Sequence, residues 1–395
     1  MKRAIFWQNC PSIHQTALIR SVGDVLGTPS VVVIEAPLDQ RRLGAGWTMP
    51  DYGDSTVIVA PSAAERRRLE EASADSAMHV FSGLGAYPQT TGSMVRLAPS
   101  RRAGGSVSLV YVEPWPESLL RDVKYRFARL RHRGTVDGVL ACGRAGVEQY
   151  RRIGFGASRV FEFGYFLDVA DACKYPDVGA GAGGTGPVRL VFVGRLDGNK
   201  RLNWALKALS VLRDRDWRLD VVGTGPRHDE LTRLADELHV GDRVRWHGVL
   251  PNHEVNVLLA ASDVLVLPSR YDGWGAVVNE ALGAGTPAIV SDAAGSAALV
   301  AGGARGSVFS ALSLDSLRRA LLHHLDEGPV DPGRRADIRS WAAHRASAPA
   351  AATYLLEIAA SVRSGGPVPA PPWRMPPLEA GPAAGWSGGP TGVSF

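Results

Sequence analysis

The sequence repeats one pattern over most of its length: a short run of apolar and β-branched residues, then a stretch whose apolar positions have helical spacing. Strands that alternate with helices in this way build βαβ units, which place their strands in parallel sheets. In the first half of the chain the predicted strands are 4–10, 30–36, 55–60, 77–83, 106–114, 136–143 and 159–166. The fold class that follows is α/β, with the carboxyl ends of the strands gathered at one edge of a parallel sheet.

A glycine-rich segment, DVGAGAGGTGP at 177–187, interrupts this pattern and has no apolar periodicity, which is typical of a linker. A second series of predicted strands follows at 188–194, 217–223, 243–248, 263–269 and 286–292, with helices expected at 311–325 and 340–362. Because 395 residues exceed what one core usually holds, we predict two parallel-sheet domains that face a shared cleft. The predicted divisions are an N-terminal domain at 1–175, a linker at 176–187, a C-terminal domain at 188–335, a C-terminal helix at 336–363 and a disordered Gly- and Pro-rich tail at 364–395.

Cysteine content and hydropathy bear on the cellular compartment. Cys10, Cys142 and Cys173 are too few and too scattered for a disulfide framework or a zinc cluster, which favours a reducing compartment. No stretch of about 18 apolar residues occurs, so the sequence predicts no transmembrane helix. The apolar run near the N-terminus is too short for the core of a signal peptide. We therefore expect a cytoplasmic protein.

Charge is distributed unevenly, because the formal net charge of +5 arises entirely within residues 1–175. Part of this excess lies in LLRDVKYRFARLRHRG at 119–134, where basic residues surround Val123, Phe127 and Leu130. A basic amphipathic helix can make a peripheral contact with an anionic membrane or face an acidic partner, although such charge runs are commonly the solvated face of a helix. A nucleic-acid partner is not expected, since no recognised binding motif accompanies the charge.

Glycines and cations follow two of the predicted strands in the second half. Gly194 and Arg195 come directly after a strand, and Lys200 precedes a predicted helix, an arrangement that suits a diphosphate. In the loop GTGP, Gly223 and Gly225 open another helix, as in a phosphate-binding loop. Each loop by itself is better explained as a strand-to-helix turn, and the second lacks the third glycine and the acid of a dinucleotide-binding fingerprint.

The stretch SRYDGWGAVVNEALGAGTPAIVSD at 269–292 carries the most specific signal. Asp272 precedes the turn Gly273-Trp274-Gly275, whose N–H groups would form an anion site at the start of a helix expected over 276–284. Glu280 follows eight residues after Asp272 and is expected about two turns down that helix on a similar face. Two such carboxylates can hold two sets of hydroxyls, as when a carboxylate accepts from the vicinal diol of a ribose. The alternatives are that Asp272 only caps the helix and that Glu280 is a solvated acid.

Taken together with RWHG at 245–248, these motifs resemble the GT-B glycosyltransferases of the large retaining family 4, over most of 188–300. That family usually reads E-G-[FW]-G-x5-E-A. The resemblance implies two Rossmann-like domains with a nucleotide-diphosphate-sugar bound between them. By position, Arg195 and Lys200 would neutralise the donor diphosphate and Glu280 would hold the ribose. The other donor-binding positions would be Gly194, Gly223, Gly225, His247 beside the base, Gly273, Trp274, Gly275, Ala276 and Val277.

Asp272 departs from the family pattern, in which glutamate is more frequent at this position. Aspartate keeps the charge but is one methylene shorter, so a contact with the donor sugar would be shifted or would need a bound water. This departure weakens any inference about which sugar is used and leaves the inference about the chemistry unchanged.

The first half of the chain resembles the same enzymes less specifically. Gln8 and Asn9 end the first predicted strand, and His14 and Gln15 follow it. All four would face the acceptor side of the cleft, although His14 is equally well explained as a core or capping histidine. Glu113, at the end of another strand, is a candidate for contact with the acceptor hydroxyl or the reacting face, or else an ordinary loop acid. In this family the C-terminal helix, here 336–363, crosses back to the N-terminal domain.

The resemblance implies that a sugar moves from a UDP- or GDP-sugar, UDP being the expected nucleotide, to an acceptor hydroxyl with retention of configuration and with neither cofactor nor metal. Arg195 and Lys200 would stabilise the leaving diphosphate in the role that a metal ion plays elsewhere. The predicted catalytic residues are Arg195, Lys200, Asp272, Glu280 and Glu113. The acceptor would be a glycan, a lipid-linked sugar or a small natural product. The alternatives are a nucleotide-sugar 2-epimerase and a non-catalytic nucleotide-sugar-binding protein of the same fold.

Overall fold

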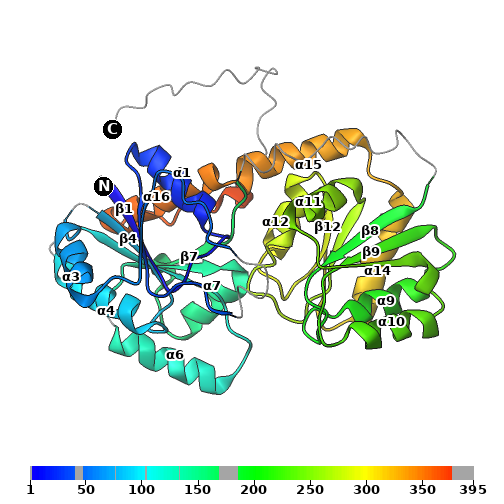
Figure 1. The fold of residues 1–395 in the computed structure, drawn as a ribbon, viewed down its shortest axis with the longest axis horizontal. Helices are drawn as coiled ribbons and strands as arrows, with labels where there is room; N and C mark the ends of the chain where they lie inside the picture. The colour runs from blue at the N-terminus through cyan, green and yellow to red at the C-terminus, as the bar shows by residue number, and fades with distance from the viewer. Residues whose placement is uncertain are drawn as a thin grey trace.

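The computed structural model describes residues 2–40, 48–75, 77–102, 105–132, 134–168 and 186–375. Two α/β lobes lie side by side, with the C-terminal helices running across both (Figure 1). Nearly all of the predicted linker at 176–187, and the tail beyond 375, lie outside the described residues.

The N-terminal lobe is built on a seven-stranded sheet with the order β3-β2-β1-β4-β5-β6-β7, in which every neighbouring pair is parallel. All six residues of the interior strand β5 are buried, which is the pattern expected of a parallel strand covered by helices on both faces. Every strand overlaps the apolar run that predicted it. The strands are β1 Arg3–Gln8, β2 Val31–Ile34, β3 Thr56–Val59, β4 Ala77–Ser82, β5 Val107–Val112, β6 Gly138–Cys142 and β7 Val160–Phe163.

Local residues set the ends of two helices in this lobe. α1 ends at Gly27, which adopts the left-handed conformation that glycine tolerates best. α3 begins with a capping box, in which the side chains of Ser62 and Glu65 accept from each other's backbone N–H groups. The helices are α1 Thr16–Leu26, α3 Ala63–Ala72, α4 Pro88–Arg96, α5 Ala98–Arg102, α6 Leu119–Arg131, α7 Gly143–Arg152 and the 3-10 turn η1 Ala157–Arg159.

The C-terminal lobe has a six-stranded parallel sheet with the order β10-β9-β8-β11-β12-β13. Its strands are β8 Val188–Val193, β9 Trp217–Val222, β10 Val244–Gly248, β11 Val264–Leu267, β12 Ala288–Ser291 and β13 Gly306–Phe309. The edge strand β13 was not predicted, because its four residues include a glycine and a serine and so lack a recognisable apolar run. The helices are α9 Leu202–Ser210, α10 His228–Glu237, η2 Gly241–Arg243, α11 Asn252–Ala261, α12 Val277–Gly283, α13 Ala297–Val300 and α14 Leu314–Glu327.

The predicted helix at 340–362 is wrong as a single element, because two helices occupy this region: α15 Pro332–Arg345 and α16 Ala348–Ser364. Pro349 lies in the first turn of α16, where its missing N–H is tolerated but could not continue a helix from α15. At the break, the backbone of Ser347 pairs with that of Leu167, just after β7. α15 packs against α12 of the C-terminal lobe, whereas α16 packs along α1 of the N-terminal lobe.

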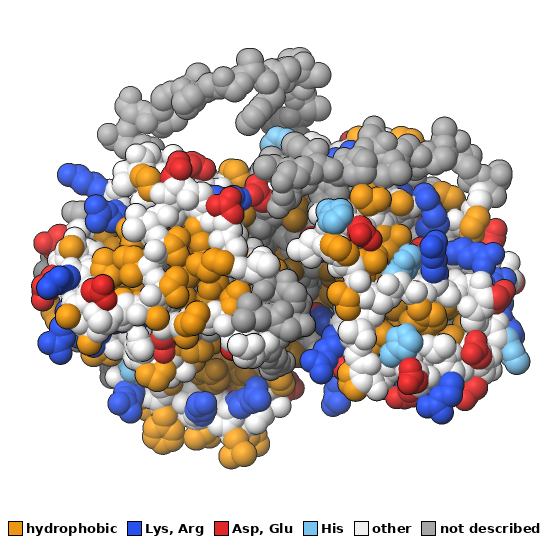
Figure 2. Space-filling model, in the orientation of Figure 1, with side chains coloured by type: hydrophobic (Ala, Val, Ile, Leu, Met, Phe, Trp, Pro, Cys, Tyr) orange, Lys and Arg blue, Asp and Glu red, His pale blue; other side chains and the backbone are white. Residues whose placement is uncertain are grey.

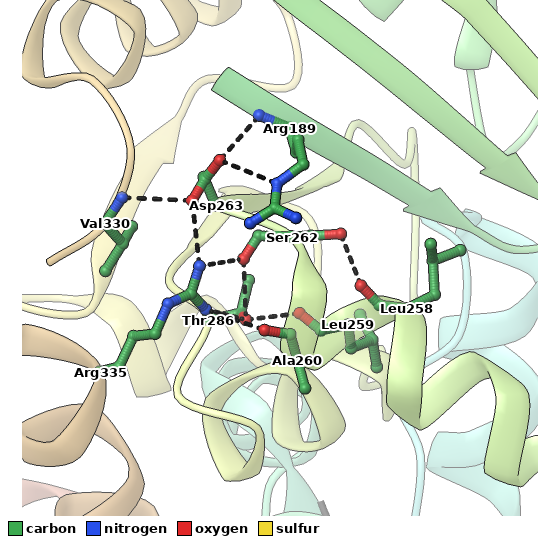
Figure 3. Close-up of polar contacts among 9 residues, drawn as sticks. All are labelled: Arg189, Leu258, Leu259, Ala260, Ser262, Asp263, Thr286, Val330 and Arg335. Carbon is green, nitrogen blue, oxygen red and sulfur yellow. Dashed lines mark hydrogen bonds and ion pairs between the residues drawn. The ribbon is translucent and has the colours of Figure 1, made fainter. Parts of the chain in front are cut away.

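A buried ion pair fastens α15 to the C-terminal lobe (Figure 3). Arg335 donates to the Asp263 carboxylate at 3.0 Å and to the carbonyl oxygen of Ser262 at 2.6 Å. The other carboxylate oxygen of Asp263 accepts from the backbone N–H of Arg189, at the start of β8. Both charged side chains are almost fully buried, so each depends on these partners to offset the cost of leaving water.

Part of the predicted disordered tail is instead packed against both lobes. Pro372–Arg374 form a 3-10 turn, η3, and Trp373 within it is buried. The indole ring of Trp373 lies 5.8 Å from the ring of Phe166 and 5.7 Å from that of Trp274, which belong to different lobes. The expectation of disorder is therefore wrong for this segment, because its tryptophan completes the apolar contact between the lobes.

Candidate functional site

The two glycine-rich loops after β8 and β9 pack against each other. The N–H of Leu196 donates to the carbonyl oxygen of Thr224 at 3.0 Å. Gly223 has φ +128°, and a Cβ there would come closer than 3.0 Å to the carbonyl oxygen of Gly194. A Cβ on Gly225 would also come closer than 3.0 Å to the carbonyl oxygen of Leu196. Both glycines of the GTGP loop are thus required by the contact between these loops, whether or not a phosphate binds beside them.

Lys200 is presented by a turn that one aspartate organises. A carboxylate oxygen of Asp197 accepts from the backbone N–H groups of Asn199 and Lys200, both at 2.9 Å. The Lys200 ammonium then lies 2.5 Å from the Asp272 carboxylate, which joins the loop after β8 to the loop after β11. The Arg195 side chain is mostly exposed, with its guanidinium 3.5 Å from the Asp197 carboxylate. The structure therefore brings two of the predicted catalytic residues, Lys200 and Asp272, into direct contact.

The turn at 272–276 is shaped by backbone pairing with the segment after β12. The N–H of Asp272 donates to the carbonyl oxygen of Ala293 at 3.1 Å. Gly275 has φ +93°, and a Cβ at this position would come closer than 3.0 Å to the side chains of Leu267 and Ser296. The glycine predicted as part of an anion site is therefore also the residue that lets the turn pass over β11.

Glu280 lies in the first turn of α12, since this helix begins only at Val277. The expectation that it lies two turns down the helix is wrong, because residues 272–276 form an irregular turn. Burial raises the pKa of its carboxyl to about 7. Glu280 and Ala276 line an interdomain cleft of about 700 Å3, together with His14 from the other lobe.

Trp274 makes an interdomain contact rather than presenting its ring to the cleft. Its indole N–H donates to the Asn279 side chain at 2.7 Å, and the amide of Asn279 donates to the backbone carbonyl of Tyr165 at 2.9 Å. The ring is buried so closely against the backbone of Gly164 that a Cβ there would overlap it. Asn279 and Gly164 were not predicted, because each packs against a partner that lies more than 100 residues away in the sequence.

Glu113 approaches this turn from the opposite lobe, directly after β5. Its carboxylate accepts from the hydroxyl of Tyr165. The other carboxylate oxygen of Glu113 would lie 3.0 Å from a Cβ on Gly273, so the absence of a side chain there leaves room for this acid. The hydroxyl of Tyr271 donates to the carbonyl oxygen of Pro114, which adds a second contact between the lobes at the same place. Nothing in the sequence singled out Tyr165 or Tyr271.

The residues predicted at the end of β1 and just after it lie together beside Tyr165 and Glu113. His14 stacks on Tyr165 with ring centroids 5.1 Å apart, and burial lowers the pKa of its imidazole. The side chain of Gln8 is buried and donates to that of Gln15 at 2.7 Å. Gln8, Asn9, His14, Gln15 and Glu113 all line a second cavity, of about 520 Å3.

His247 pairs with a side chain on the neighbouring strand of its own sheet. Its imidazole lies 2.5 Å from the Asp220 carboxylate, and both side chains are half-buried between β9 and β10. His247 is not among the residues that line the 700 Å3 cleft or the 520 Å3 cavity. Within the described residues, no group of three or more His, Cys, Asp or Glu side chains is placed to hold a metal ion.

Two Rossmann-like parallel-sheet domains that face a cleft define the GT-B architecture of glycosyltransferases, and a solved structure confirms this fold. The structure of Anabaena Alr3699/HepE in complex with UDP matches 91% of this chain and 100% of its own, with a TM-score of 0.65 at 15% identity.

Residues 183–342 match the model of the family described as glycosyl transferases group 1. Glycogen synthase of Mycobacterium tuberculosis is 34% identical over 168 residues, which are 42% of this chain and 40% of that protein. The alpha-D-kanosaminyltransferase of Streptomyces kanamyceticus is 25% identical over 266 residues, 65% of this chain and 67% of that protein. This chain thus spans about two fifths of the length of the first of these relatives.

Proposed function

We propose that this protein is a glycosyltransferase that moves a sugar from a nucleotide-diphosphate-sugar to an acceptor hydroxyl. One observation carries the proposal: where the two lobes meet, Lys200 pairs with Asp272 and Glu113 of the N-terminal lobe reaches Gly273 in the same turn. Beside this turn, Glu280 and His14 line one interdomain cleft from opposite lobes. The family match over residues 183–342 and the GT-B fold support it.

On the donor side, Glu280 would accept hydrogen bonds from the ribose diol, which lower the cost of ionising its buried carboxyl. Lys200 and Arg195 would neutralise the diphosphate, and the turn at 273–277 would contact phosphate or sugar. Lys200 is already paired with Asp272, so its ammonium is held in place before the donor arrives. UDP is the proposed nucleotide, a choice supported by the HepE structure, which holds UDP.

The proposed reaction retains configuration at the anomeric carbon. The acceptor oxygen forms a bond to that carbon, the bond from carbon to the diphosphate oxygen breaks, and the acceptor proton passes to an oxygen of the leaving diphosphate. Lys200 and Arg195 stabilise the negative charge that develops on the diphosphate, the role that would make a metal ion unnecessary. Asp272 holds Lys200 and contacts the donor sugar, and Glu113 binds the acceptor hydroxyl beside the reacting face.

The acceptor would occupy the 520 Å3 cavity of the N-terminal lobe. Trp115, Tyr87, Tyr125 and Tyr271 are among its walls, and aromatic faces of this kind pack well against the apolar faces of sugar rings. A glycan, a lipid-linked sugar and a small natural product remain candidate acceptors, the last in keeping with the name of the kanosaminyltransferase relative. The reaction would take place in the cytoplasm, with segment 119–134 in peripheral contact with an anionic membrane.

A nucleotide-sugar 2-epimerase would use the same donor-side residues but needs no acceptor. The 520 Å3 cavity beside Glu113 favours transfer, because it offers a second ligand a place next to the turn at 272–276.

The proposal is tested by measuring nucleoside diphosphate release from a panel of UDP-, GDP- and dTDP-sugars. Wild type should hydrolyse one donor slowly, and Glu280→Ala should lose this activity. The matched control is Glu237→Ala, which removes an exposed acid at the end of α10 and should leave the rate unchanged. Saturable donor binding without release by wild type would indicate a non-catalytic binding protein. No binding of any donor by calorimetry would overturn the proposal.

A further inference from the structure

One face of α6 leaves large apolar side chains in solvent. None of the 13 residues of this helix is buried, and Leu119 and Phe127 are 85% and 68% exposed. At about 100° per residue, the exposed apolar side chains fall within one narrow arc of the helix. They are Leu119, Leu120, Val123, Phe127 and Leu130. Figure 2 shows hydrophobic and basic side chains together over α6, at the lower edge of the N-terminal lobe.

The opposite face fixes how α6 is rotated. The indole N–H of Trp115 donates to the Asp122 carboxylate at 2.9 Å, and the Trp115 ring stacks on that of Tyr125 at 4.2 Å. Arg129 lies with its guanidinium 5.7 Å from the ring centroid of Phe155, so this cation belongs to the packed face. These contacts hold the apolar arc toward solvent.

Cations border the apolar arc on both sides. By helical position, Lys124 and Arg131 flank one edge and Arg126 flanks the other, and all three side chains are exposed. Long basic side chains can lie along an apolar surface while their charges reach the phosphates of a lipid headgroup layer. Arg133, which was expected to contribute to this charge, lies outside the described residues.

We propose that the apolar arc of α6 inserts shallowly into the surface of an anionic bilayer, with Lys124, Arg126 and Arg131 contacting the headgroups. A merely solvated helix face would not display five large apolar side chains in one arc. A second copy of this chain docking the same face would bring like charges together, whereas an anionic lipid surface complements them. The contact is peripheral, because no helix in the described part of the chain has the length and hydropathy to cross a bilayer.

This contact has a consequence for the acceptor, a step that rests on the proposed function. Arg121 and Tyr125, on the same helix, line the 520 Å3 cavity that contains Glu113. Docking of α6 would therefore place the rim of the acceptor cavity beside the headgroup layer. The acceptor class that fits is a hydroxyl compound carried at the bilayer surface, such as a lipid-linked sugar.

The test is co-sedimentation of the full chain with vesicles of phosphatidylcholine, with or without phosphatidylglycerol. Wild type should bind the anionic vesicles, with an affinity that falls as salt rises. The double variant Leu120→Ser/Phe127→Ser and the double variant Lys124→Glu/Arg126→Glu should each bind at least tenfold more weakly. The matched controls are Val211→Ser, an exposed apolar residue of the C-terminal lobe, and Arg67→Glu/Arg68→Glu on α3, which should bind like wild type.

Absence of vesicle binding by wild type, or equal binding by the α6 variants, would overturn the inference. A wild-type dimer that these variants dissociate, without vesicle binding, would also overturn it and assign the face to a second copy. Nucleoside diphosphate release without vesicles is measured in parallel and should be unchanged in the α6 variants. Vesicle binding by a protein that releases no nucleoside diphosphate would refute the proposed function and leave the membrane contact standing.

Discussion

Glu280→Gln is the substitution that tests the donor site most directly, because it removes a charge while keeping the size of the side chain. The pKa of Glu280 is raised to about 7 by burial, so this carboxyl changes its charge within the range where enzymes are assayed. An ionised carboxylate accepts stronger hydrogen bonds from ribose hydroxyls than the neutral acid does. Donor binding by wild type should therefore weaken as the pH falls through about 7.

The size of the effect follows from the pKa. With a pKa of about 7, roughly a tenth of the Glu280 carboxyl is ionised at about pH 6 and roughly nine tenths at about pH 8. The dissociation constant of the donor should thus be up to about tenfold higher at the lower pH, which is about 1.4 kcal/mol of binding free energy.

The assay is calorimetric titration with UDP-glucose, whose diester phosphates stay ionised throughout this range. In Glu280→Gln the affinity should be weaker and nearly independent of pH. Other groups that line the cleft, among them His14, Asp168 and His253, remain in the variant and report any background pH dependence. Parallel pH profiles for wild type and variant would refute the assignment of Glu280 to the ribose.

The raised pKa of the Glu280 carboxyl also predicts that the folded protein is less stable at high pH. Between the ordinary value of 4.5 and the folded value of about 7, the folded state binds more protons than the unfolded state. The free energy of unfolding of wild type should therefore fall, relative to Glu280→Gln, by about 3 kcal/mol as the pH rises through this window. Denaturant unfolding at the two ends of the window measures the difference, and a rise in place of the fall would contradict the raised pKa.

Three further substitutions test the surrounding structure. Lys200→Ala should lower donor turnover by at least about tenfold, with partial recovery in Lys200→Arg; turnover equal to wild type would remove Lys200 from the site. Gly164→Ala should cost about 1–3 kcal/mol of unfolding free energy, because its methyl group overlaps the Trp274 ring, and thermal melting would show this. Arg335→Ala should destabilise the C-terminal lobe by about 1–3 kcal/mol, since the buried Asp263 carboxylate would lose its closest cation and keep only Arg189, 3.6 Å away; an unchanged denaturant midpoint would contradict this account.

The strands could be predicted because each is a local pattern. The run VSLVYV is apolar or aromatic at every position except Ser108 and rich in β-branched residues, which is typical of a strand buried on both faces. The edge strand β13 and the break between α15 and α16 were missed for the opposite reason. At both places the local pattern is weak, and a contact with a distant partner decides the structure: β12 for the strand, and Leu167 for the break.

In the candidate site, too, local patterns were predictable and contacts with distant residues were not. The order of glycines, cations and acids along 188–300 predicted which loops carry the candidate donor-side residues, and the structure places these loops after strands of one parallel sheet. Their side chains were harder to assign. Trp274 and His247 are predicted to contact the donor; the structure adds that Trp274 packs between the lobes, with its indole N–H donating to Asn279, and that His247 pairs with Asp220.

By itself, then, the sequence determined the α/β class, the two series of strands and the spacing of the motif from Asp272 to Glu280, all of which depend on neighbours within a few turns or strands. Only the tertiary structure decided that Lys200 pairs with Asp272, that Glu113 reaches Gly273, and that burial gives the Glu280 carboxyl a pKa of about 7. The physical reason is that each of these properties depends on how two sheets and their loops pack. The partners are far apart in the sequence, and burial is a property of the assembled fold rather than of the residue.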